Sequence, residues 1–587
     1  MNATVPAAPA AARGPAPAAP RPPRAAASLV VIRDAPAGLE VLLLLRAERG
    51  DHNSSAWVFP GGIVDAGDRH SHHLTEGDDA AVSVQLGVGE GGLDYQVAAL
   101  RECFEECGLL FATGPDGALL PPAAVAALQS WRGPLHRGER TLAEFCEQGR
   151  LRLNVDQFAY LSHWLTPAGR PKRFDTRFFI AIAPGGQVVA HDETEIVAHQ
   201  WLRPAVALAQ GDTMRLMTPT RATLQALTQF DSAAAAMAWA RGQRTVPRIQ
   251  PRLGIGAQGV RPVTPDEYAY AEIGRLDPDG RGDACYDIQP GVAVRLSPRL
   301  IRVTANNGSV MTGPGTNTYL IGGGPRNEWA VVDPGPHDDS HVEDVLAAAP
   351  GPIRWIFATH THIDHSPATV LLRARTGAVV HGRIAAHPER QDHTFAPEHI
   401  LEDGERIALN PETTLRAIHT PGHASNHLCY LLEEEKTLLT GDHVMQSSTV
   451  VINPPDGDMT AYIASLRALA RDLGDALDWL APGHGFLMDG PKEAFERIVR
   501  HRLRREAKVV SALGTLGALG AVSPSTLLGT VYDDVPQRMH PVALRSLLAH
   551  LHKLRDDGVA GEEEGRWALT APVPAAPDPH PGASQPR

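Results

Sequence analysis

Two short apolar runs open the patterned part of the chain. ASLVVIRD (residues 27–34) and LEVLLLLRA (residues 39–47) are separated by APAG, which contains the proline and glycine typical of turns. Short apolar runs bounded by turn residues are typical of β-strands, so this pattern predicts a β-hairpin. Mixed strand and helix patterns continue to about residue 230. Residues 28–230 are therefore expected to form an α/β domain.

Changes in the pattern predict further boundaries. Residues 231–290 are rich in glycine and proline, as in RTVPRIQPRLGIGAQG, and are expected to be a connection. A second α/β domain is expected over residues 291–494. Residues 495–570 contain helical patterns followed by the strand-like RWALT, which is the outline of a winged helix. The Ala- and Pro-rich residues 1–27 and the tail 571–587 are expected to be disordered.

Length and composition fit several domains rather than one. The 587 residues exceed the usual size of a domain, and the net charge of −13 argues against a dedicated nucleic-acid binder. Five irregularly spaced cysteines fit a reducing compartment, and no apolar run is long enough to cross a membrane. The first 27 residues lack the apolar centre of a secretory signal. We expect a cytoplasmic protein without membrane contact, whose oligomeric state the sequence leaves open.

The segment LRECFEECGLL, residues 100–110, is the first candidate for chemistry. Glu102, Glu105 and Glu106 fall on one face of a predicted helix, because positions three and four apart are neighbours. Clustered carboxylates repel one another unless a cation lies among them. Their oxygens suit Mg²⁺ or Mn²⁺, ions that assist phosphate chemistry. The alternative is an acidic helix face in water, which is the commoner meaning of a charge run.

This helix and the preceding PGG resemble the Nudix box, whose pattern is G-x5-E-x7-R-E-U-x-E-E-x-G-U. Gly62 and Asp68 take its first two places, and the segment from Arg101 to Leu109 matches its second half. Arg101 follows Asp68 by 33 positions where the pattern has 8, so an insert of 25 residues splits the box. Such a split box is similar to the peroxisomal coenzyme A diphosphatase branch of the family. The resemblance covers about residues 25–230 and implies a Nudix α/β/α sandwich.

The Nudix resemblance implies hydrolysis of a nucleoside diphosphate linked to another group, with a coenzyme A-like substrate favoured. The three glutamates would be catalytic and would hold the Mg²⁺ or Mn²⁺ ions that polarise the diphosphate. Arg101 would orient a carboxylate. Glu193 and Glu195, in DETEIVAHQWL, are candidates for a further ligand or base. Exposed loop acids are an equally good interpretation of these two residues.

A second candidate site lies in RWIFATHTHIDHSPA, residues 354–368. The segment has the pattern of a buried strand that ends in a loop carrying His360, His362, Asp364 and His365. A single histidine is more often structural than a ligand, but four donors within six residues at a strand end indicate a metal site. Three further donors follow later strand patterns, namely His423, Asp442 and His484.

These residues resemble the metallo-β-lactamase superfamily motifs, H-x-H-x-D-H followed by H, D and H. The resemblance implies a four-layer αββα sandwich with two metal ions at the sheet edge. The first ion would be bound by His360, His362 and His423. The second ion would be bound by Asp364, His365 and His484. Asp442 and a hydroxide would bridge the two ions, and Asp333 would orient a loop without being a ligand.

The same resemblance implies the chemistry of the site. Two Zn²⁺ ions are favoured by the histidines, while the two carboxylates leave Mn²⁺ or iron open. A two-metal hydroxide suits hydrolysis of an ester, a thioester or a phosphodiester, and we count Asp364 among the catalytic residues. His427 is a candidate for substrate contact, and packing behind the ligands is at least as good an interpretation.

The MTGPGTNTYLIGGG segment and the winged-helix outline are similar to the winged-helix-tailed branch of the superfamily, which includes single-strand endoribonucleases. This resemblance covers about residues 291–570. HRLRREAK, residues 501–508, could contact phosphates, although a basic face in water is the more ordinary interpretation.

The sequence as a whole indicates a fusion of two metal-dependent hydrolases that act on small nucleotide-type molecules. The first half would cleave a nucleoside-diphosphate-linked substrate, and the second would hydrolyse an ester, thioester or phosphodiester. Two alternatives stay open. One is an RNA-processing protein with an endoribonuclease half, and the other is a protein in which one half is a binding module.

Overall fold

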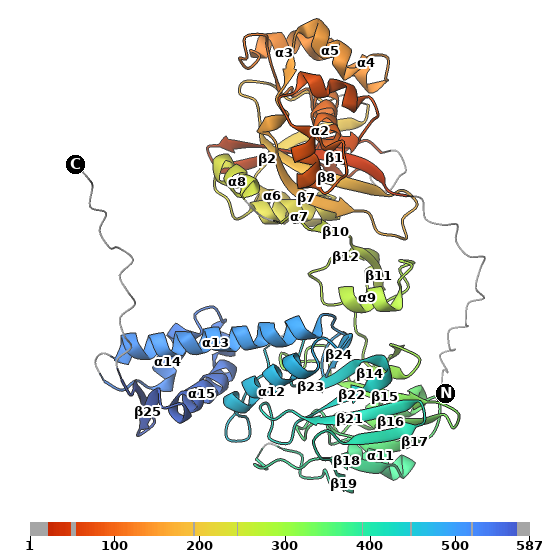
Figure 1. Cartoon of the computed structure of the whole chain (residues 1–587), viewed down its shortest axis with the longest axis vertical. Coiled ribbons are helices and arrows are strands. Elements are labelled where there is room, and N and C mark those ends of the chain that lie inside the picture. Colours follow the sequence, from red (N-terminus) through yellow and green to blue (C-terminus); the bar gives the residue numbers. More distant parts are fainter. Residues whose placement is uncertain are drawn as a thin grey trace. The chain divides into compact units, whose positions relative to one another are not determined.

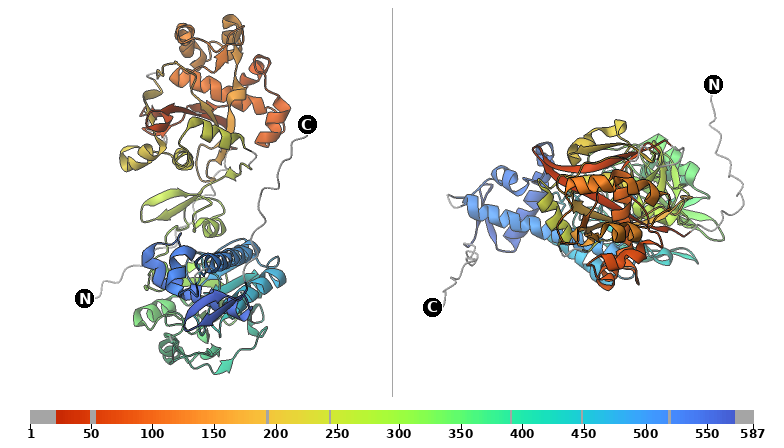
Figure 2. Two further views of the ribbon diagram at one scale, coloured as in Figure 1. Left: turned by 90° about the vertical axis from the view of Figure 1, so that its left-hand side faces the viewer. Right: turned by 90° about the horizontal axis from the view of Figure 1, so that it is seen from above.

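The computed structural model describes residues 22–48, 54–191, 194–242, 245–389, 391–446, 449–517 and 520–571. Two compact units make up the chain. The first consists mainly of residues up to 254, and the second mainly of residues from 284 onward. Figure 1 labels the elements of both units, and Figure 2 gives two further views.

A mixed eight-stranded sheet forms the centre of the first unit. Its order is β10-β7-β8-β1-β2-β3, with β4 paired to β1 and β9 paired to β2. β1 and β2 form the predicted hairpin, in which Ile32 lies opposite Val41 and Ala35 lies opposite Gly38. The strands are β1 (Arg24–Ala35), β2 (Gly38–Arg46), β3 (Trp57–Val58), β4 (Gly61–Ile63), β7 (Ala159–Leu165), β8 (Phe174–Ile182), β9 (Ile196–Leu202) and β10 (Arg248–Ile249).

Both faces of this sheet are buried, which explains why its strands are apolar without alternation. Leu29 and Val31 of β1 face a core beneath α2 (Gly92–Cys107). Val30 and Ile32 of the same strand face a second core, beneath α7 (Thr218–Leu227) and α8 (Ala233–Arg241). Helices on both faces make this unit the expected α/β/α sandwich (Figure 1).

Two inserted segments lie around α2. The insert that splits the Nudix box forms a 3-10 helix (Asp68–Leu74) and α1 (Asp79–Leu86), and both contact α2. After α2 the chain forms β5 (Ala112–Thr113), three short helices and β6 (Arg152–Leu153). The short helices are α3 (Pro122–Leu128), α4 (Arg132–His136) and α5 (Leu142–Gly149).

Two expected boundaries of the first domain are wrong. β1 begins at Arg24, inside the segment expected to be a disordered tail, and Ala26 pairs with Ile63 of β4. An alanine-rich segment carries little strand signal, but pairing with β4 on one side and β8 on the other makes it a strand. The expected connection, residues 231–290, also contributes to the first unit. Met237 of α8 lies in the core, and β10 extends the sheet beside β7.

The rest of the expected connection is also structured. β11 (Arg252–Gly256) and β12 (Gly259–Val263) pair with each other, and α9 (Tyr270–Leu276) follows. Residues 266–278, which include α9, belong to the second unit. The glycines and prolines of this region therefore mark turns between short elements rather than an unstructured linker.

Two sheets lie face to face in the second unit. The first has the order β13 to β19 and the second the order β20 to β24. Tyr319 and Phe357 of the first sheet share a core with Leu415 and Tyr430 of the second. The strands are β13 (Ala293–Arg295), β14 (Leu300–Thr304), β15 (Asn317–Gly323), β16 (Glu328–Val332), β17 (Ile353–Phe357), β18 (Val379–Gly382), β19 (His399–Ile400), β20 (Arg406–Asn410), β21 (Thr413–His419), β22 (Leu428–Leu432), β23 (Thr437–Gly441) and β24 (Trp479–Pro482).

Helices cover the outer face of each sheet, so this unit contains the predicted αββα sandwich (Figure 1). α10 (Asp339–Ala348) and α11 (Thr369–Thr376) pack on the first sheet. α12 (Met459–Asp472) and the first half of α13 (Pro491–Leu516) pack on the second sheet.

The second half of α13 belongs to the winged helix. Its Val509 and Leu513 share a core with Leu527 of α14 (Pro524–Val531) and Leu547 of α15 (His540–Asp556). The wing is the hairpin of β25 (Ala560–Glu563) and β26 (Arg566–Leu569). The expected domain boundary at residue 495 falls inside α13, so one helix is shared by two cores.

The basic segment HRLRREAK lies within α13, where Arg504 and Lys508 are exposed and two other arginines are buried. Arg502 is buried and donates a hydrogen bond to the backbone oxygen of Val450. Arg505 is also buried and forms an ion pair with Asp534. Both guanidinium groups are therefore used inside the protein, and neither is presented for phosphate contact.

The structure also describes the state of the cysteines and the length and polarity of the helices, which the composition had addressed. All five cysteines, each of which lies in the described part of the chain, are free thiols. The closest two are Cys103 and Cys107 of α2, whose sulfur atoms lie 3.5 Å apart. Among the described residues, every helix is either too short or too polar to cross a membrane.

Candidate active sites

The first candidate site lies along α2 and the glycine loop before it. Glu105 and Glu106 are buried, with 4% and 3% of their surface exposed. The backbone N–H of Gly61 donates a 2.9 Å hydrogen bond to Glu106 Oε2. A Cβ atom on Gly62 would lie 2.3 Å from Glu102 Oε1, so a larger residue there would displace this carboxylate from its present position. The three glutamates of α2 thus converge on one loop.

Arg101 connects the carboxylates to the first part of the split box. Its Nε donates a 2.8 Å hydrogen bond to Asp68 Oδ1, and its Nη1 donates to Glu102 at 2.9 Å and to Glu105 at 3.4 Å. Asp68 is itself buried, with 2% of its surface exposed. The insert therefore loops out and returns, and it leaves Asp68 beside the helix.

Burial opposes negative charge at this site. Burial raises the pKa of Glu105 to about 7, although the Arg101 charge acts in the opposite direction. Burial also raises the pKa of Glu106 well above its usual value, and the nearby charge of Glu102 adds to the effect. A divalent cation would reverse this balance, because it favours the ionised form of each carboxylate. The donor set consequently fits a hard cation such as Mg²⁺.

A cavity of about 1120 Å³ opens beside the three glutamates. Besides Arg101, five cationic side chains line it, and so do the aromatic side chains of Trp164, Phe174 and Phe178. The cationic residues are Arg24, Arg46, Arg140, Arg170 and Lys172. The cavity therefore combines acidic groups that could hold a cation with basic groups that suit a polyanionic substrate. Glu195 lines the same cavity, whereas Glu193 lies outside the described residues.

One contributor to this cavity has no signal in the sequence. His136 at the end of α4 lines the cavity, and its Nδ1 lies 3.7 Å from Glu105 Oε2. Arg140 and Thr141 of the same inserted segment also line it. The segment belongs to no motif, so only the folded structure brings it to the glutamates.

The second candidate site forms where four strands of the αββα sandwich end. His360, His362, Asp364 and His365 follow β17, and His423, Asp442 and His484 follow β21, β23 and β24. Three groups of these side chains place their potential ligand atoms within 4.8 Å of one another. The groups are His360–His362–His423, His360–His365–Asp442 and Asp364–His365–His484. All seven predicted residues therefore meet, although 124 positions separate His360 from His484.

Hydrogen bonds at Nδ1 orient several of these histidines. His365 Nδ1 donates to Asp333 Oδ2 at 2.9 Å. His423 Nδ1 donates to the backbone oxygen of Val451 at 2.8 Å, and His484 Nδ1 donates to the backbone oxygen of Gly315 at 3.1 Å. A proton donated from Nδ1 leaves Nε2 as the ring atom that can bind a metal. In His423 this Nε2 lies 3.0 Å from His362 Nδ1.

Buried polar atoms without partners mark the centre of this cluster. The Nε2 atoms of His360, His365 and His484 and the Oδ1 atom of Asp442 are buried and make no hydrogen bond. His365 and His484 reach Asp442 Oδ1 through ion-pair contacts of 3.3 and 3.2 Å. Unpaired buried polar atoms are costly, and four of them in one place indicate a ligand that completes their coordination. The donor set of imidazoles and carboxylates fits Zn²⁺ or a similar transition metal.

The electrostatics of the second site hold Asp442 ionised and His360 neutral, whereas His365 and His484 favour the charged form in the metal-free protein. Burial disfavours the charge on these two histidines, but the carboxylates of Asp364 and Asp442 outweigh it and raise the pKa of both, so a metal would displace a proton from each. Burial opposes ionisation of Asp442, but the charges of His484 and His365 outweigh it and hold the pKa of this carboxyl well below its usual range. Burial, together with the neighbouring histidines, lowers the pKa of His360 well below its usual value. An ionised carboxylate and a neutral imidazole are the forms that bind metal.

Asp333 and His427 lie beside the cluster but belong to none of its three groups of potential ligands. Asp333 accepts hydrogen bonds from the backbone N–H and the hydroxyl of Thr359, at 2.7 and 2.8 Å, as well as from His365. His427 is fully buried behind His360, with ring centres 5.1 Å apart. A side chain without exposed surface does not reach a substrate, so the structure favours packing for His427.

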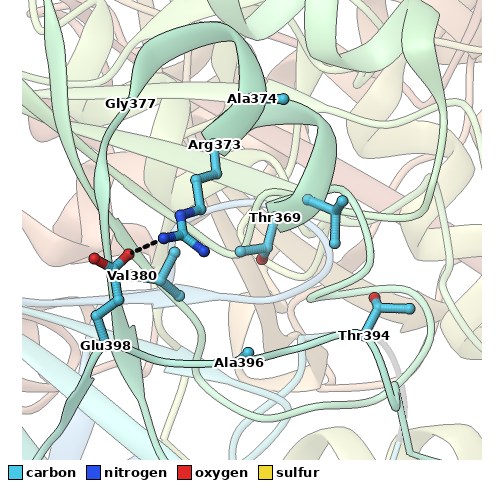
Figure 3. A pocket seen from close by; sticks show the side chains of 9 residues that line it. Thr369, Arg373, Ala374, Gly377, Val380, Thr394, Ala396 and Glu398 are labelled. Carbon is cyan, nitrogen blue, oxygen red and sulfur yellow. Dashed lines mark ion pairs between the residues drawn. The ribbon is translucent and has the colours of Figure 1, made fainter.

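A smaller hollow of about 410 Å³ lies beside α11 (Figure 3). Arg373 and Glu398 form an ion pair of 3.0 Å across it. Its lining contains none of the candidate ligands or bases discussed above.

Comparisons with known families match three parts of the chain. A family described as NUDT19 Nudix domain matches residues 85–216, and the Metallo-beta-lactamase superfamily matches residues 311–484. A Beta-lactamase associated winged helix domain matches residues 523–567. Among relatives, Lactamase-like protein vrtG of Penicillium aethiopicum is 30% identical over 286 residues, which are 46% of this chain and 88% of that protein.

The chain belongs to the metallo-β-lactamase superfamily. Atrochrysone carboxyl ACP thioesterase of Aspergillus chevalieri is 31% identical over 52% of this chain and 94% of its own length. Beta-lactamase-like protein 2 homolog of Caenorhabditis elegans is 29% identical over 45% of this chain and 87% of its own length. This superfamily member also carries a Nudix domain and a winged helix, so the predicted fusion is confirmed. Both domain families are metal-dependent, and the protein is a hydrolase.

Proposed function

We propose that the protein is a bifunctional hydrolase in which the lactamase-like domain cleaves an acyl thioester and the Nudix domain cleaves a coenzyme A-like diphosphate. The observation that carries the proposal is the convergence of unpaired buried atoms at the second site, from His360, His365, His484 and Asp442. Relatives named as acyl carrier protein thioesterases support the thioester as the bond attacked.

The ligand sets follow the grouping of side chains at the second site. His360, His362 and His423 would hold one ion, and Asp364, His365 and His484 the other, with Asp442 between them. Two zinc ions, when bound, would supply a Lewis acid and lower the pKa of a coordinated water. Asp333 keeps Thr359 and His365 in place through three hydrogen bonds, so the geometry is fixed before substrate arrives.

The Nudix cavity supports a substrate with several negative charges. Glu102, Glu105 and Glu106 would hold Mg²⁺ or Mn²⁺ at one side of the diphosphate, and the five cationic side chains of the cavity would neutralise its other oxygens. Arg101 keeps two of these glutamates oriented and stays among the carboxylates. The aromatic side chains that line the cavity suit the stacking of a base.

Coenzyme A esters contain both bonds that the two domains would cleave. Hydrolysis of the thioester adds water to the carbonyl, breaks the C–S bond and releases an acid and a thiol. Hydrolysis of the diphosphate adds water to one phosphorus, breaks a P–O bond and leaves one phosphate of the linkage on each of the two products. One substrate could therefore be degraded in two steps by one chain, which gives the fusion a chemical reason.

The test is a hydrolysis panel on purified full-length protein with coenzyme A, acyl-coenzyme A, ADP-ribose and short single-stranded RNA. We expect thiol release from acyl-coenzyme A without added Mg²⁺, and diphosphate cleavage of coenzyme A that requires Mg²⁺ or Mn²⁺. Cleavage of RNA with no thiol release would reject the thioesterase assignment and favour the endoribonuclease alternative. Preference for ADP-ribose over coenzyme A would reject the coenzyme A assignment.

A further inference from the structure

The loop that carries His484 is closed by backbone hydrogen bonds. Leu480 and Met488 exchange two of them, each 2.9 Å long, so residues 481–487 form a short loop with His484 near its tip. The position of the His484 ring therefore depends on how this loop is held. Its imidazole is 2% exposed and its Nε2 is one of the unpaired atoms of the cluster.

One side of the loop is held by the first sheet. Asn317 of β15 donates its side-chain N–H groups to the oxygens of Pro482 and Gly485, at 3.0 and 2.8 Å. The backbone N–H of Asn317 also donates to the oxygen of Gly483 at 2.7 Å. These contacts fix the first half of the loop, up to Gly485.

The other side of the loop is held by α9, in the segment that the sequence suggested to be a linker. Glu272 Oε2 accepts a 2.8 Å hydrogen bond from the backbone N–H of Leu487. Phe486 N–H donates to Gln446 Oε1 at 2.8 Å, and Gln446 in turn donates to the backbone oxygen of Tyr268 at 2.7 Å. The backbone N–H groups of Phe486 and Leu487 are thus connected to residues 268–272, the first through Gln446 and the second directly.

A buried arginine fixes the carboxylate of Glu272 in turn. Arg302 of β14 donates from both Nη atoms to Glu272, at 2.7 and 3.0 Å, and both side chains are 2% exposed. Arg302 Nη1 also lies 3.4 Å from the oxygen of Gly485. A buried ion pair by itself adds little stability relative to apolar residues of similar size. Its particular value here is that a bidentate arginine leaves Glu272 one orientation, which faces Leu487.

We propose that Glu272 is a positioning residue that sets the His484 loop and thereby the second metal-binding group, Asp364–His365–His484. The inference rests on the ligand set given in the proposed function. Residues outside a metal's ligands that orient them typically change metal affinity by ~10- to 100-fold when replaced. The effect of Glu272 is expected on this group and not on His360–His362–His423, because Glu272 contacts neither of the strand ends that carry those histidines.

The test compares variants of the full-length chain that leave no buried charge unpaired. Glu272→Met with Arg302→Met removes both charges and the acceptor for Leu487 N–H. Glu272→Gln with Arg302→Met restores an uncharged acceptor at the same place. Arg275→Met is the control, since Arg275 lies on the same helix and pairs with Glu435 at 3.4 Å without contacting the loop.

Zinc binding is measured against buffered zinc, together with the melting temperature of the zinc-free proteins. We expect wild type and Arg275→Met to bind two zinc ions per chain. The variant with Glu272→Met and Arg302→Met should bind the second ion at least ~10-fold more weakly, with binding of the first ion unchanged. The variant with Glu272→Gln and Arg302→Met should recover most of that loss.

Equal zinc binding by all variants would overturn the inference. So would an equal weakening of both ions together with a lower melting temperature, because that result shows a structural role only. A wild-type protein that retains no transition metal would overturn the ligand set itself and the inference with it. The proposal is supported if affinity for the second zinc ion alone is lost in the variant with Glu272→Met and Arg302→Met and recovers in the variant with Glu272→Gln and Arg302→Met.

Discussion

At the scale of single residues, the three glutamates of α2 show how burial prepares a cation site. Glu105 is almost fully buried, and burial raises its pKa to about 7. In the metal-free protein this shift favours the folded state most below pH 4.5, and the contribution is lost as the pH rises through about 7. A bound cation would take the place of the proton.

We therefore predict that Mg²⁺ binding to the Nudix domain becomes tighter with rising pH. The apparent affinity should increase by up to about tenfold per pH unit for each proton released, because burial raises the pKa of Glu105 to about 7 and also raises that of Glu106. Calorimetric titrations between pH 5.5 and 8.5 measure this dependence. Glu105→Gln should bind more weakly and lose part of the pH dependence. An affinity that is constant over this range in the wild type would contradict the prediction.

A second residue-scale prediction concerns acid stability of the αββα sandwich. His341 of α10 is buried beside Thr318, with Nε2 and Oγ1 2.7 Å apart, and burial lowers its pKa to about 4. A histidine with a lowered pKa contributes stability above its unfolded pKa of 6.5, and the contribution is lost as the pH falls through about 4.

The melting temperature of the second unit should therefore fall between pH 6.5 and 4, by an amount equivalent to about 3 kcal/mol from this residue. His341→Gln should be less stable at pH 7 but should show a shallower decline. Melting curves at four or five pH values give the two slopes. Identical slopes for the variant and the wild type would show that other groups dominate.

At the scale of elements, α13 explains why the winged helix cannot be cut off at the predicted boundary. Phe495 is fully buried in the core of the second sheet, whereas Leu513 of the same helix lies in the core of the winged helix. A deletion from residue 495 removes side chains that the sandwich needs. The domain boundary predicted from the pattern is therefore not the boundary at which the chain can be divided.

We predict that deletion of residues 495–587 abolishes zinc retention, whereas deletion of residues 520–587 preserves it. The shorter deletion keeps α13 and the core around Phe495, although it exposes Val509 and Leu513 and should promote aggregation. Phe495→Ala is the matched point variant and should destabilise the sandwich by about 3–5 kcal/mol. Zinc content and melting temperature of the purified proteins decide between the outcomes, and zinc retention by the longer deletion would contradict the prediction.

At the scale of the whole molecule, the two sites lie in different units and are built from different ligands. We predict that they act independently. Glu105→Gln with Glu106→Gln should abolish diphosphate cleavage and leave thioester cleavage unchanged, and His362→Ala should do the reverse. Both reactions are measured on the same preparations, with circular dichroism as the control for folding. Loss of both activities in either folded variant would contradict two separate sites.

The part of the chemistry that depends on residues close together in the chain could be predicted from the sequence. The spacing of three glutamates on one helical face, the four donors that follow β17 and the apolar runs of β1 and β2 are properties of short segments. Neighbouring residues share a strand or helix whatever the rest of the chain does, so local periodicity predicts them. The two domain families followed from these segments and the winged helix from the helical patterns of residues 495–570, and the family matches confirm all three.

Only the tertiary structure decided which distant residues meet these segments. Asp68 returns to Arg101 across an insert, His136 reaches Glu105 from a helix without a motif, and Glu272 holds the His484 loop from a supposed linker. Arg502 and Arg505 form part of a basic run, yet they are buried between packed elements. Such contacts depend on loop closure and on the packing of whole elements. The order of residues in the chain does not encode them locally, because their energy arises only when the faces of those elements come together.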